Sequence, residues 1–210
     1  MIENIHWLGH DTFRIENDKI IYTDPYELKG KPPKADLILI THDHSDHCSP
    51  DDVAKIAKDD TVIVTIAAAA QKLKGDVRVV KPGESLVVHG IPIETVPAYN
   101  VTKFRSPGVP FHPKESGHVG FIITVGGLRI YHAGDTDVIP EMDDIEADIA
   151  LLPVGGTYTM TADEAAQAAN RIQPKIAIPM HHSAIVGSVK DAQRFADLCE
   201  MEVVILSQGR

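Results

Sequence analysis

Residues 35–47 read A-D-L-I-L-I-T-H-D-H-S-D-H, and this stretch decides the fold. Its first six residues are almost all apolar, which predicts a strand that is buried on both faces of a sheet. The polar residues after it then lie beyond the carboxyl end of that strand, where open α/β sheets place their ligands. Residues 42–47 contain three histidines and two aspartates, which a solvated loop does not need and an apolar core does not tolerate unpaired. The stretch therefore predicts a divalent-metal site at the end of a buried strand.

The spacing within this stretch allows two ions. His42 and His44 are two residues apart, so both side chains leave an extended backbone on the same side. Asp46 and His47 are adjacent in the following turn and can point elsewhere, toward a second ion. Imidazole nitrogen and carboxylate oxygen suit zinc, manganese or iron. We expect one or two divalent ions per chain, with zinc as the first choice.

The rest of the chain reads as strands and helices of a single domain, residues 1–210. Apolar runs and turn signals predict strands at residues 2–8, 11–16, 19–23, 62–66, 77–80, 85–88, 91–96, 119–125, 128–132, 149–152, 175–179 and 203–206. Helices are predicted to begin at residue 50, to occupy an alanine-rich segment as far as about residue 74, and to span residues 161–172 and 188–199. Two β-rich halves, each ending in helix–strand units, predict a four-layer αββα sandwich of the α/β class.

The composition excludes several classes of protein. Hydrophobic residues make up 43% of the chain and charged residues 24%, as in ordinary soluble proteins. No apolar run approaches the length of a membrane span, and the first residues do not form a signal peptide, so we expect a cytoplasmic protein. The formal net charge of −10 argues against a nucleic-acid partner. Cys48 and Cys199 are the only cysteines, which excludes a disulfide framework and a thiolate zinc site, while a homo-oligomer stays open.

The pattern His42-x-His44-x-Asp46-His47 resembles the signature of the metallo-β-lactamase-fold superfamily of metal-dependent hydrolases. The spacing and the H-A-G-D-T segment at residues 132–136 are most similar to a branch of small single-domain hydrolases that includes ascorbate-6-phosphate lactonase. The resemblance covers nearly the whole chain and implies hydrolysis by metal-activated water, because a bound divalent ion lowers the pKa of water toward 7.

Other landmarks of that superfamily follow in order. Asp24, in T-D-P, resembles an early aspartate that contacts a metal ligand rather than the metal. Asp135 resembles the aspartate that bridges two metals, and His181 matches the final histidine ligand. We expect Asp135 and Asp46 to be the catalytic residues. His182 is expected beside the site or on the surface, and His132 in the core.

One departure from the superfamily pattern concerns the first metal. Related enzymes supply a third histidine from the segment after the central strands, where this chain reads P-A-Y-N at residues 97–100. We rank His112 first as the replacement, Asn100 second through its carbonyl oxygen, and His118 last because it begins a strand. The first metal site is therefore expected to be weaker or to depend on a loop.

The long segment 98–117 is the main clue to the substrate. Loops of this length inside a compact domain are usually functional or mobile. Tyr99, Lys103 and Arg105 are its predicted substrate contacts, and the positive charge of the lysine and the arginine favours a small anionic substrate, either a lactone or a phosphoester. A merely solvated loop explains the charges equally well. Residues 155–158, G-G-T-Y, are a second candidate wall, and His10 lies either at a hairpin tip or beside the substrate.

Two alternative functions remain open from the sequence. A nuclease or cyclic phosphodiesterase uses the same chemistry, although the chain lacks a basic surface for such a substrate. A metal-binding or ligand-sensing protein that has lost catalysis would be consistent with the missing histidine. Cys48 directly follows the predicted ligands but is expected to be a small buried neighbour rather than a nucleophile.

Overall fold

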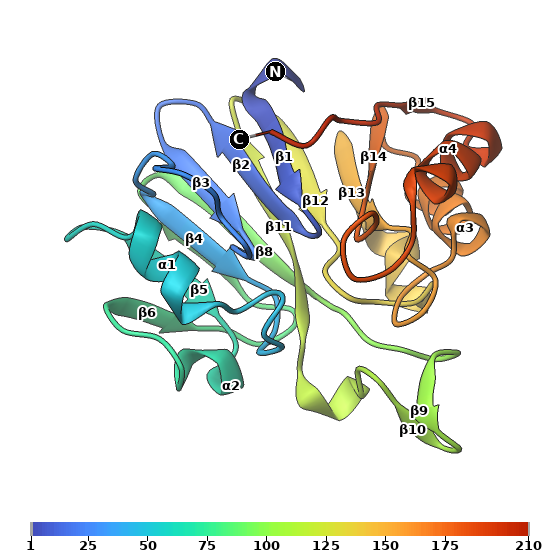
Figure 1. Ribbon diagram of the computed structural model, residues 1–210, viewed down its shortest axis with the longest axis horizontal. Helices are drawn as coiled ribbons and strands as arrows, with labels where there is room; N and C mark the ends of the chain where they lie inside the picture. The colour runs from blue at the N-terminus through green and yellow to red at the C-terminus, as the bar shows by residue number, and fades with distance from the viewer. Residues whose placement is uncertain (1, 210) are drawn as a thin grey trace.

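The structure is a computed structural model that describes residues 2–209, and it contains two large sheets (Figure 1). The first sheet has the strand order β1-β2-β3-β4-β5-β6. Its strands are β1 (Ile5–Gly9), β2 (Thr12–Glu16), β3 (Ile20–Thr23), β4 (Leu37–Ile40), β5 (Val62–Thr65) and β6 (Asp76–Val79). β1 to β3 pair antiparallel, and β3 to β6 pair parallel.

The second sheet has the order β15-β14-β13-β12-β11-β8-β7. Its strands are β7 (Ser85–Val88), β8 (Ile91–Pro97), β11 (Val119–Val125), β12 (Leu128–His132), β13 (Ile149–Pro153), β14 (Ile176–Met180) and β15 (Glu202–Val203). β12 to β15 pair parallel, whereas β7, β8, β11 and β12 pair antiparallel. Each sheet thus joins an antiparallel part to a parallel part.

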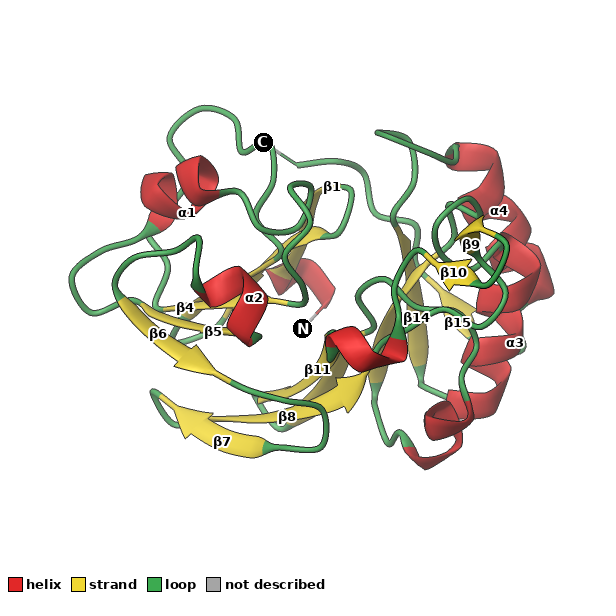
Figure 2. Ribbon diagram, turned by 90° about the horizontal axis from the view of Figure 1, so that it is seen from below, coloured by secondary structure: helices red, strands yellow, loops and turns green. Residues whose placement is uncertain are grey.

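Helices cover the outer side of each sheet (Figure 2). α1 (Pro50–Ile56) and α2 (Ala67–Ala70) lie beside the first sheet, and α3 (Ala162–Ile172) and α4 (Val189–Leu198) lie against β13 and β14 of the second. This is the predicted αββα arrangement. No helix among residues 2–209 is long and apolar enough to cross a bilayer.

Local signals in the sequence explain where the helices begin. Ser49 caps α1 by accepting a hydrogen bond from the backbone N–H of Asp52, directly before Pro50. Thr161 and Glu164 form the predicted capping box of α3, and Ser188 forms a second one at α4. Both α3 and α4 therefore start within a residue of the predicted position.

The core lies between the sheets and covers both faces of the central parallel strands. All four residues of β4 are buried, as its apolar run predicted, and so are those of β5 and β13. The backbone N–H of Val119 donates to the carbonyl oxygen of Thr41, 3.2 Å away, which joins the start of β11 to the residue after β4. The two sheets are consequently in contact where the predicted metal ligands begin.

A few predicted boundaries were wrong. Residues 2–4 form a 3₁₀ helix rather than a strand, the alanine-rich helix ends at Ala70, and the last strand is only Glu202–Val203. The segment 98–117 is not an open loop. It contains a hairpin of β9 (Phe104–Ser106) and β10 (Val109–Pro110) and a 3₁₀ turn, Lys114–Ser116. The hairpin projects from the body of the protein (Figure 1).

Candidate metal centre

The candidate site is built from segments that follow strands of both sheets. His42 follows β4, Asp135 follows β12 and His181 follows β14, all at carboxyl ends. His10 lies in the turn between β1 and β2, so both sheets contribute to the site. The prediction that these distant segments converge matches their placement, with Asp135 and His181 lying directly beside the imidazoles of the residues that follow β4.

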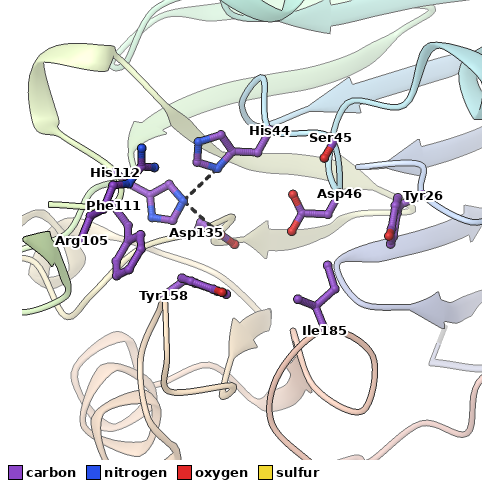
Figure 3. Close-up of a pocket in the computed structure, with 10 residues that line it drawn as sticks. All are labelled: Tyr26, His44, Ser45, Asp46, Arg105, Phe111, His112, Asp135, Tyr158 and Ile185. Atoms are coloured by element: carbon purple, nitrogen blue, oxygen red, sulfur yellow. Dashed lines mark hydrogen bonds and ion pairs between the residues drawn. The ribbon is translucent and has the colours of Figure 1, made fainter.

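His42, His44 and His112 form what we call the first group, and their ring nitrogens converge. His42 Nε2 lies 3.0 Å from His44 Nδ1, and His112 Nε2 lies 3.3 Å from the same atom. Figure 3 shows His112 reaching from the segment before β11 toward both His44 and Asp135. Asn100 itself does not face these nitrogens, and His118 lies behind the group, with its ring 4.8 Å from that of His42.

The second group consists of His10, Asp46, His47 and His181. Asp46 Oδ2 is 3.2 Å from His10 Nε2 and 3.7 Å from His47 Nε2. His10 is fully buried, so it belongs to the site as well as to the hairpin turn. Of the two descriptions that the sequence left open, the hairpin turn is confirmed, whereas a contact of His10 with the substrate stays a prediction.

Asp135 lies between the two groups. Its Oδ1 is 3.4 Å from His47 Nε2 and 3.4 Å from His181 Nε2, in the second group. Its Oδ2 is 3.2 Å from His112 Nε2, in the first. One carboxylate oxygen thus faces each group, which is the geometry that bridging requires.

Asp24 fixes which ring nitrogens can face inward. It is fully buried, and its carboxylate accepts hydrogen bonds from the Thr41 amide (2.8 Å), the Thr41 hydroxyl (2.7 Å) and His47 Nδ1 (2.9 Å). Because the Thr41 hydroxyl donates to Asp24, it accepts from His42 Nδ1, 3.0 Å away. His42 therefore carries hydrogen on Nδ1 and leaves a lone pair on Nε2, directed at the first group. Against the effect of burial, Asp135 and Asp24 raise the pKa of His47 well above its ordinary value, so its Nε2 offers a lone pair to the second group once a cation displaces the proton there.

The residues fit divalent cations. Two ligands bound at about 2.0–2.1 Å in a tetrahedron lie roughly 3.3 Å apart. The spacings within the first group, and those from Asp135 to His47 and His181, are close to that. His47 Nε2, His181 Nε2 and Asp135 Oδ1 are buried and have no hydrogen-bond partner within the described chain. Buried polar atoms without partners are costly, and a cation would satisfy all of them.

Electrostatics differ between the two groups. Burial lowers the pKa of His42 well below its ordinary value and also lowers that of His44, so both are neutral and ready to donate a lone pair. Burial alone would lower the pKa of His181 too, but Asp135 and Asp11 raise it to about 9. Asp135 is held well below its usual pKa range despite burial, chiefly by His181 and His47. In the second group, the raised pKa values of His181 and His47 mean that the metal-free rings hold protons, which a bound cation would displace.

The backbone is held in unusual conformations around the site. His10, Asp24 and His181 have φ values of 49°, 39° and 56°, in the left-handed region that residues with a Cβ rarely adopt. Such positions cluster at functional sites, where the surrounding structure compensates the cost. Gly155 makes close approach possible: a Cβ there would overlap the carbonyl oxygen of His181 and lie 3.0 Å from its Nδ1.

Asp11 is a site residue that the sequence reasoning missed. It is completely buried, neither carboxylate oxygen has a hydrogen-bond partner within residues 2–209, and one oxygen is 3.8 Å from His47 Nδ1. Burial raises its pKa to about 8. The available signal was its position next to His10 in the G-H-D-T turn, since an aspartate between two strands is ordinarily solvated.

Two predicted substrate contacts lie elsewhere, because they have partners of their own. Lys103 Nζ is 2.6 Å from Glu164 Oε2 and 3.7 Å from Asp137 Oδ1, so its charge is neutralised. The Tyr99 hydroxyl donates to Glu141 Oε2 at 2.9 Å and accepts from Lys114 Nζ. Neither residue lines the cavity beside the metal groups.

Three other predictions about single residues agree with their surroundings. His132 is buried, with Nε2 2.9 Å from the carbonyl oxygen of Asp11. His182 is buried next to the site and stacks on Trp7, with ring centroids 4.7 Å apart. Cys48 is buried, and burial raises its pKa to about 11, which makes it a poor nucleophile.

A cavity of about 380 Å³ opens beside the two groups (Figure 3). Its polar wall includes His44, Asp46, His112 and Asp135. The rest is lined by Tyr26, Ser45, Arg105, Phe111, Tyr158 and Ile185. The volume suits a small molecule rather than a polymer. Tyr158, from the second predicted wall, meets Phe111 edge to face, with ring centroids 4.9 Å apart.

Comparison with known proteins agrees with this site and fold. The Beta-lactamase superfamily domain matches residues 4–181. A UPF0173 metal-dependent hydrolase of Thermoplasma acidophilum is 36% identical over 211 residues, which cover 92% of this chain and 89% of that protein. A solved structure from Parabacteroides distasonis, described as a metal-dependent hydrolase, is 38% identical, with a TM-score of 0.85 over 97% of this chain and 93% of that one. Another from Thermotoga maritima, described as a Zn-dependent hydrolase of the metallo-β-lactamase superfamily, is 25% identical, with a TM-score of 0.65 over 96% and 97% of the two chains.

The predicted superfamily and fold class are therefore confirmed, while the narrower likeness to ascorbate-6-phosphate lactonase stays a prediction. The family model matches most of the chain, and a curated relative is 36% identical over 92% of it, which together show the family. The chain belongs to the β-lactamase superfamily and, among its curated relatives, to the UPF0173 metal-dependent hydrolases.

Proposed function

We propose that this protein hydrolyses a small anionic substrate, a lactone or a phosphoester, with two divalent ions held by the first and second groups. The observation that carries the proposal is the first group itself. His42 Nε2 presents a lone pair toward His44 Nδ1 at 3.0 Å, and His112 Nε2 lies 3.3 Å from that same nitrogen. A single proton on His44 satisfies at most one of these contacts, whereas one cation satisfies all three nitrogens.

A bound divalent ion would lower the pKa of water and polarise the oxygen under attack. Around it, Asp135 stays ionised because its pKa is depressed, so its carboxylate can orient the attacking water by accepting a hydrogen bond. Asp46 lines the cavity, and the hydrogen bond from His10, opposing the effect of burial, helps lower its pKa to about 2. It remains a carboxylate throughout the physiological range. Zinc is the ion that we propose first, since imidazole and carboxylate ligands in near-tetrahedral spacing suit it.

Arg105 supports the choice of an anionic substrate. It lines the cavity and forms no ion pair with any residue from 2 to 209, whereas Lys103 pairs with Glu164 and Lys114 with Glu141. Its guanidinium lies 5.7 Å from the centroid of Phe111, which holds it over the cavity wall. A cation without a partner at a site rich in carboxylates favours a carboxylate or phosphate on the substrate.

The test is a substrate panel of lactones, phosphomonoesters and a generic phosphodiester, assayed with Zn²⁺, with Mn²⁺ and after chelation. Metal-dependent turnover of anionic lactones or phosphoesters is expected. Turnover of the phosphodiester alone would favour the nuclease alternative, and bound metal without any turnover would favour a ligand sensor. On an active substrate, Arg105→Ala should raise KM more than it lowers kcat, whereas Arg171→Ala, on the outer helix α3, should change neither.

A further inference from the structure

Asn100, which stands where related enzymes place a histidine, makes four polar contacts with its side chain. It is buried, and its Oδ1 accepts from the backbone N–H of His112 at 2.8 Å and lies 2.8 Å from His112 Nδ1. Its Nδ2 donates to the carbonyl oxygen of Tyr158 at 3.0 Å and to Asp137 Oδ1 at 3.2 Å. Every hydrogen-bonding atom of the amide therefore faces His112, Asp137 or the cavity wall.

These partners leave only one arrangement of hydrogens. A backbone N–H can only donate, and a carbonyl or carboxylate oxygen can only accept, so the Asn100 amide cannot be flipped. Oδ1 is then an acceptor toward His112 Nδ1, which must carry the hydrogen. In the neutral ring, His112 Nε2 is then the atom with the lone pair, 3.3 Å from His44 Nδ1 and 3.2 Å from Asp135 Oδ2. Asn100 thus selects the tautomer of His112 that can bind a metal.

Asp137 anchors the segment that carries this arrangement. It is buried, and its Oδ2 accepts from the backbone N–H groups of Val101 (2.8 Å) and Thr102 (2.6 Å) and from the Thr102 hydroxyl (3.0 Å). Its other oxygen accepts from Asn100. Since Asp137 is two residues from Asp135, the same short segment positions the bridging carboxylate and, through Asn100, the ring of His112.

We propose that Asn100, held by Asp137, is a positioning residue that makes His112 the third ligand of the first metal. The inference rests on the proposed function, because it presumes that the first group binds an ion. The asparagine at this place is then not the sign of a lost site. It holds a histidine delivered from the far side of the hairpin β9–β10, and the first metal depends on that segment being docked.

The experiment compares Asn100→Leu, Asn100→Asp and the matched control Asn170→Leu. Leucine has nearly the same size but no acceptor for His112, whereas aspartate keeps the acceptor and loses the donors to Tyr158 and Asp137. Asn170 lies on α3, where its side chain accepts from the backbone N–H of Glu200. The affinity for Zn²⁺ and Co²⁺ and the number of ions bound per chain show whether the first group still binds its metal. The ¹⁵N chemical shifts of the imidazoles in the metal-free protein show which nitrogen of His112 carries the hydrogen.

We expect His112 to carry hydrogen on Nδ1 in the wild type and in Asn100→Asp, and to lose this preference in Asn100→Leu. Asn100→Leu should weaken the first metal by about 10- to 100-fold and leave the second bound, since removing a group that orients a ligand has effects of that size. Asn100→Asp should bind the first metal more tightly than Asn100→Leu.

Three results would overturn the inference: hydrogen on Nε2 but not on Nδ1 of His112 in the wild type, an unchanged affinity for the first metal in Asn100→Leu, or equal losses of affinity in the leucine and aspartate variants. The wild-type ¹⁵N measurement decides the question even if Asn100→Leu fails to fold. If the wild type bound no divalent ion at all, the proposed function would fail, whereas the tautomer of His112 would still be read from the metal-free protein.

Discussion

Replacing Asp24 by asparagine tests how the second metal group is oriented. In the wild type, Asp24 Oδ1 accepts from the Thr41 amide and Oδ2 accepts from His47 Nδ1. The amide N–H of Thr41 can only donate, so the oxygen of an asparagine must stay there and its NH₂ must face His47. His47 then has to accept at Nδ1, which moves its hydrogen to Nε2. That atom is the one directed at Asp135, 3.4 Å away.

The expected magnitude follows from this change of tautomer. Loss of a group that orients a histidine ligand weakens metal binding by about 10- to 100-fold, or roughly 1.4–2.7 kcal/mol. The fold should survive, because the Thr41 amide keeps its acceptor and the side chain keeps its volume. Asp36→Asn is the matched control: Asp36 accepts from the Ile20 amide and Lys58 at the opposite end of β4, far from the histidines.

The assay is competition with a chromophoric chelator on purified variants, with circular dichroism as the check on folding. Asp24→Asn should lose affinity for the ion of the second group, and also for that of the first, because the Thr41 hydroxyl loses its acceptor and can then donate to His42 Nδ1. Asp36→Asn should bind both ions as the wild type does. Wild-type affinity for both ions in Asp24→Asn would refute this explanation of the geometry. If Asp24→Asn and Asp36→Asn lost metal affinity equally, the cause would be a general disturbance of the sheet rather than the orientation of His47.

Three further predictions concern other parts of the site. Asp135→Ala should abolish hydrolysis with circular dichroism unchanged, and retained activity would remove Asp135 from between the metals. For metal-free protein, the pKa of His181 is raised from an ordinary 6.5 to about 9, so its stabilisation is complete below pH 6.5 and is lost as the pH rises through 9. Urea denaturation after chelation should show unfolding free energy falling by up to about 3 kcal/mol over that range, and a flat or rising profile would contradict the assignment. Gly155→Ala should displace His181, because the new Cβ overlaps its carbonyl oxygen, and should lower metal content and melting temperature; unchanged values would show that the turn adapts.

The sequence predicted the parts of this protein that depend on local pattern. The apolar run before His42 gave a strand buried on both faces. Within the second sheet, the parallel pairing of β12, β13 and β14 places the carboxyl ends of β12 and β14 at the same edge. The capping box at Thr161 located the start of α3. These features are readable because periodicity and caps act over a few residues.

Other features depended on partners far away in the chain. Lys103 looked free beside the cavity, but Glu164, 61 residues later, neutralises it. Asp11 was predicted only as the first residue of a strand, but the packing of β1 and β2 against the site buries its side chain completely. Asn100 looked like a weak substitute ligand, whereas its amide holds His112, 12 residues later. Only tertiary contacts distinguish a charged or polar side chain that faces a ligand from one that is already paired.

The most direct test of the account is anomalous X-ray diffraction at the zinc absorption edge from crystals of the zinc-reconstituted protein. We predict one peak in contact with His42, His44 and His112, and a second peak beside His47 and His181, with Asp135 between the two. A map without anomalous density near these imidazoles, at saturating zinc, would contradict the account.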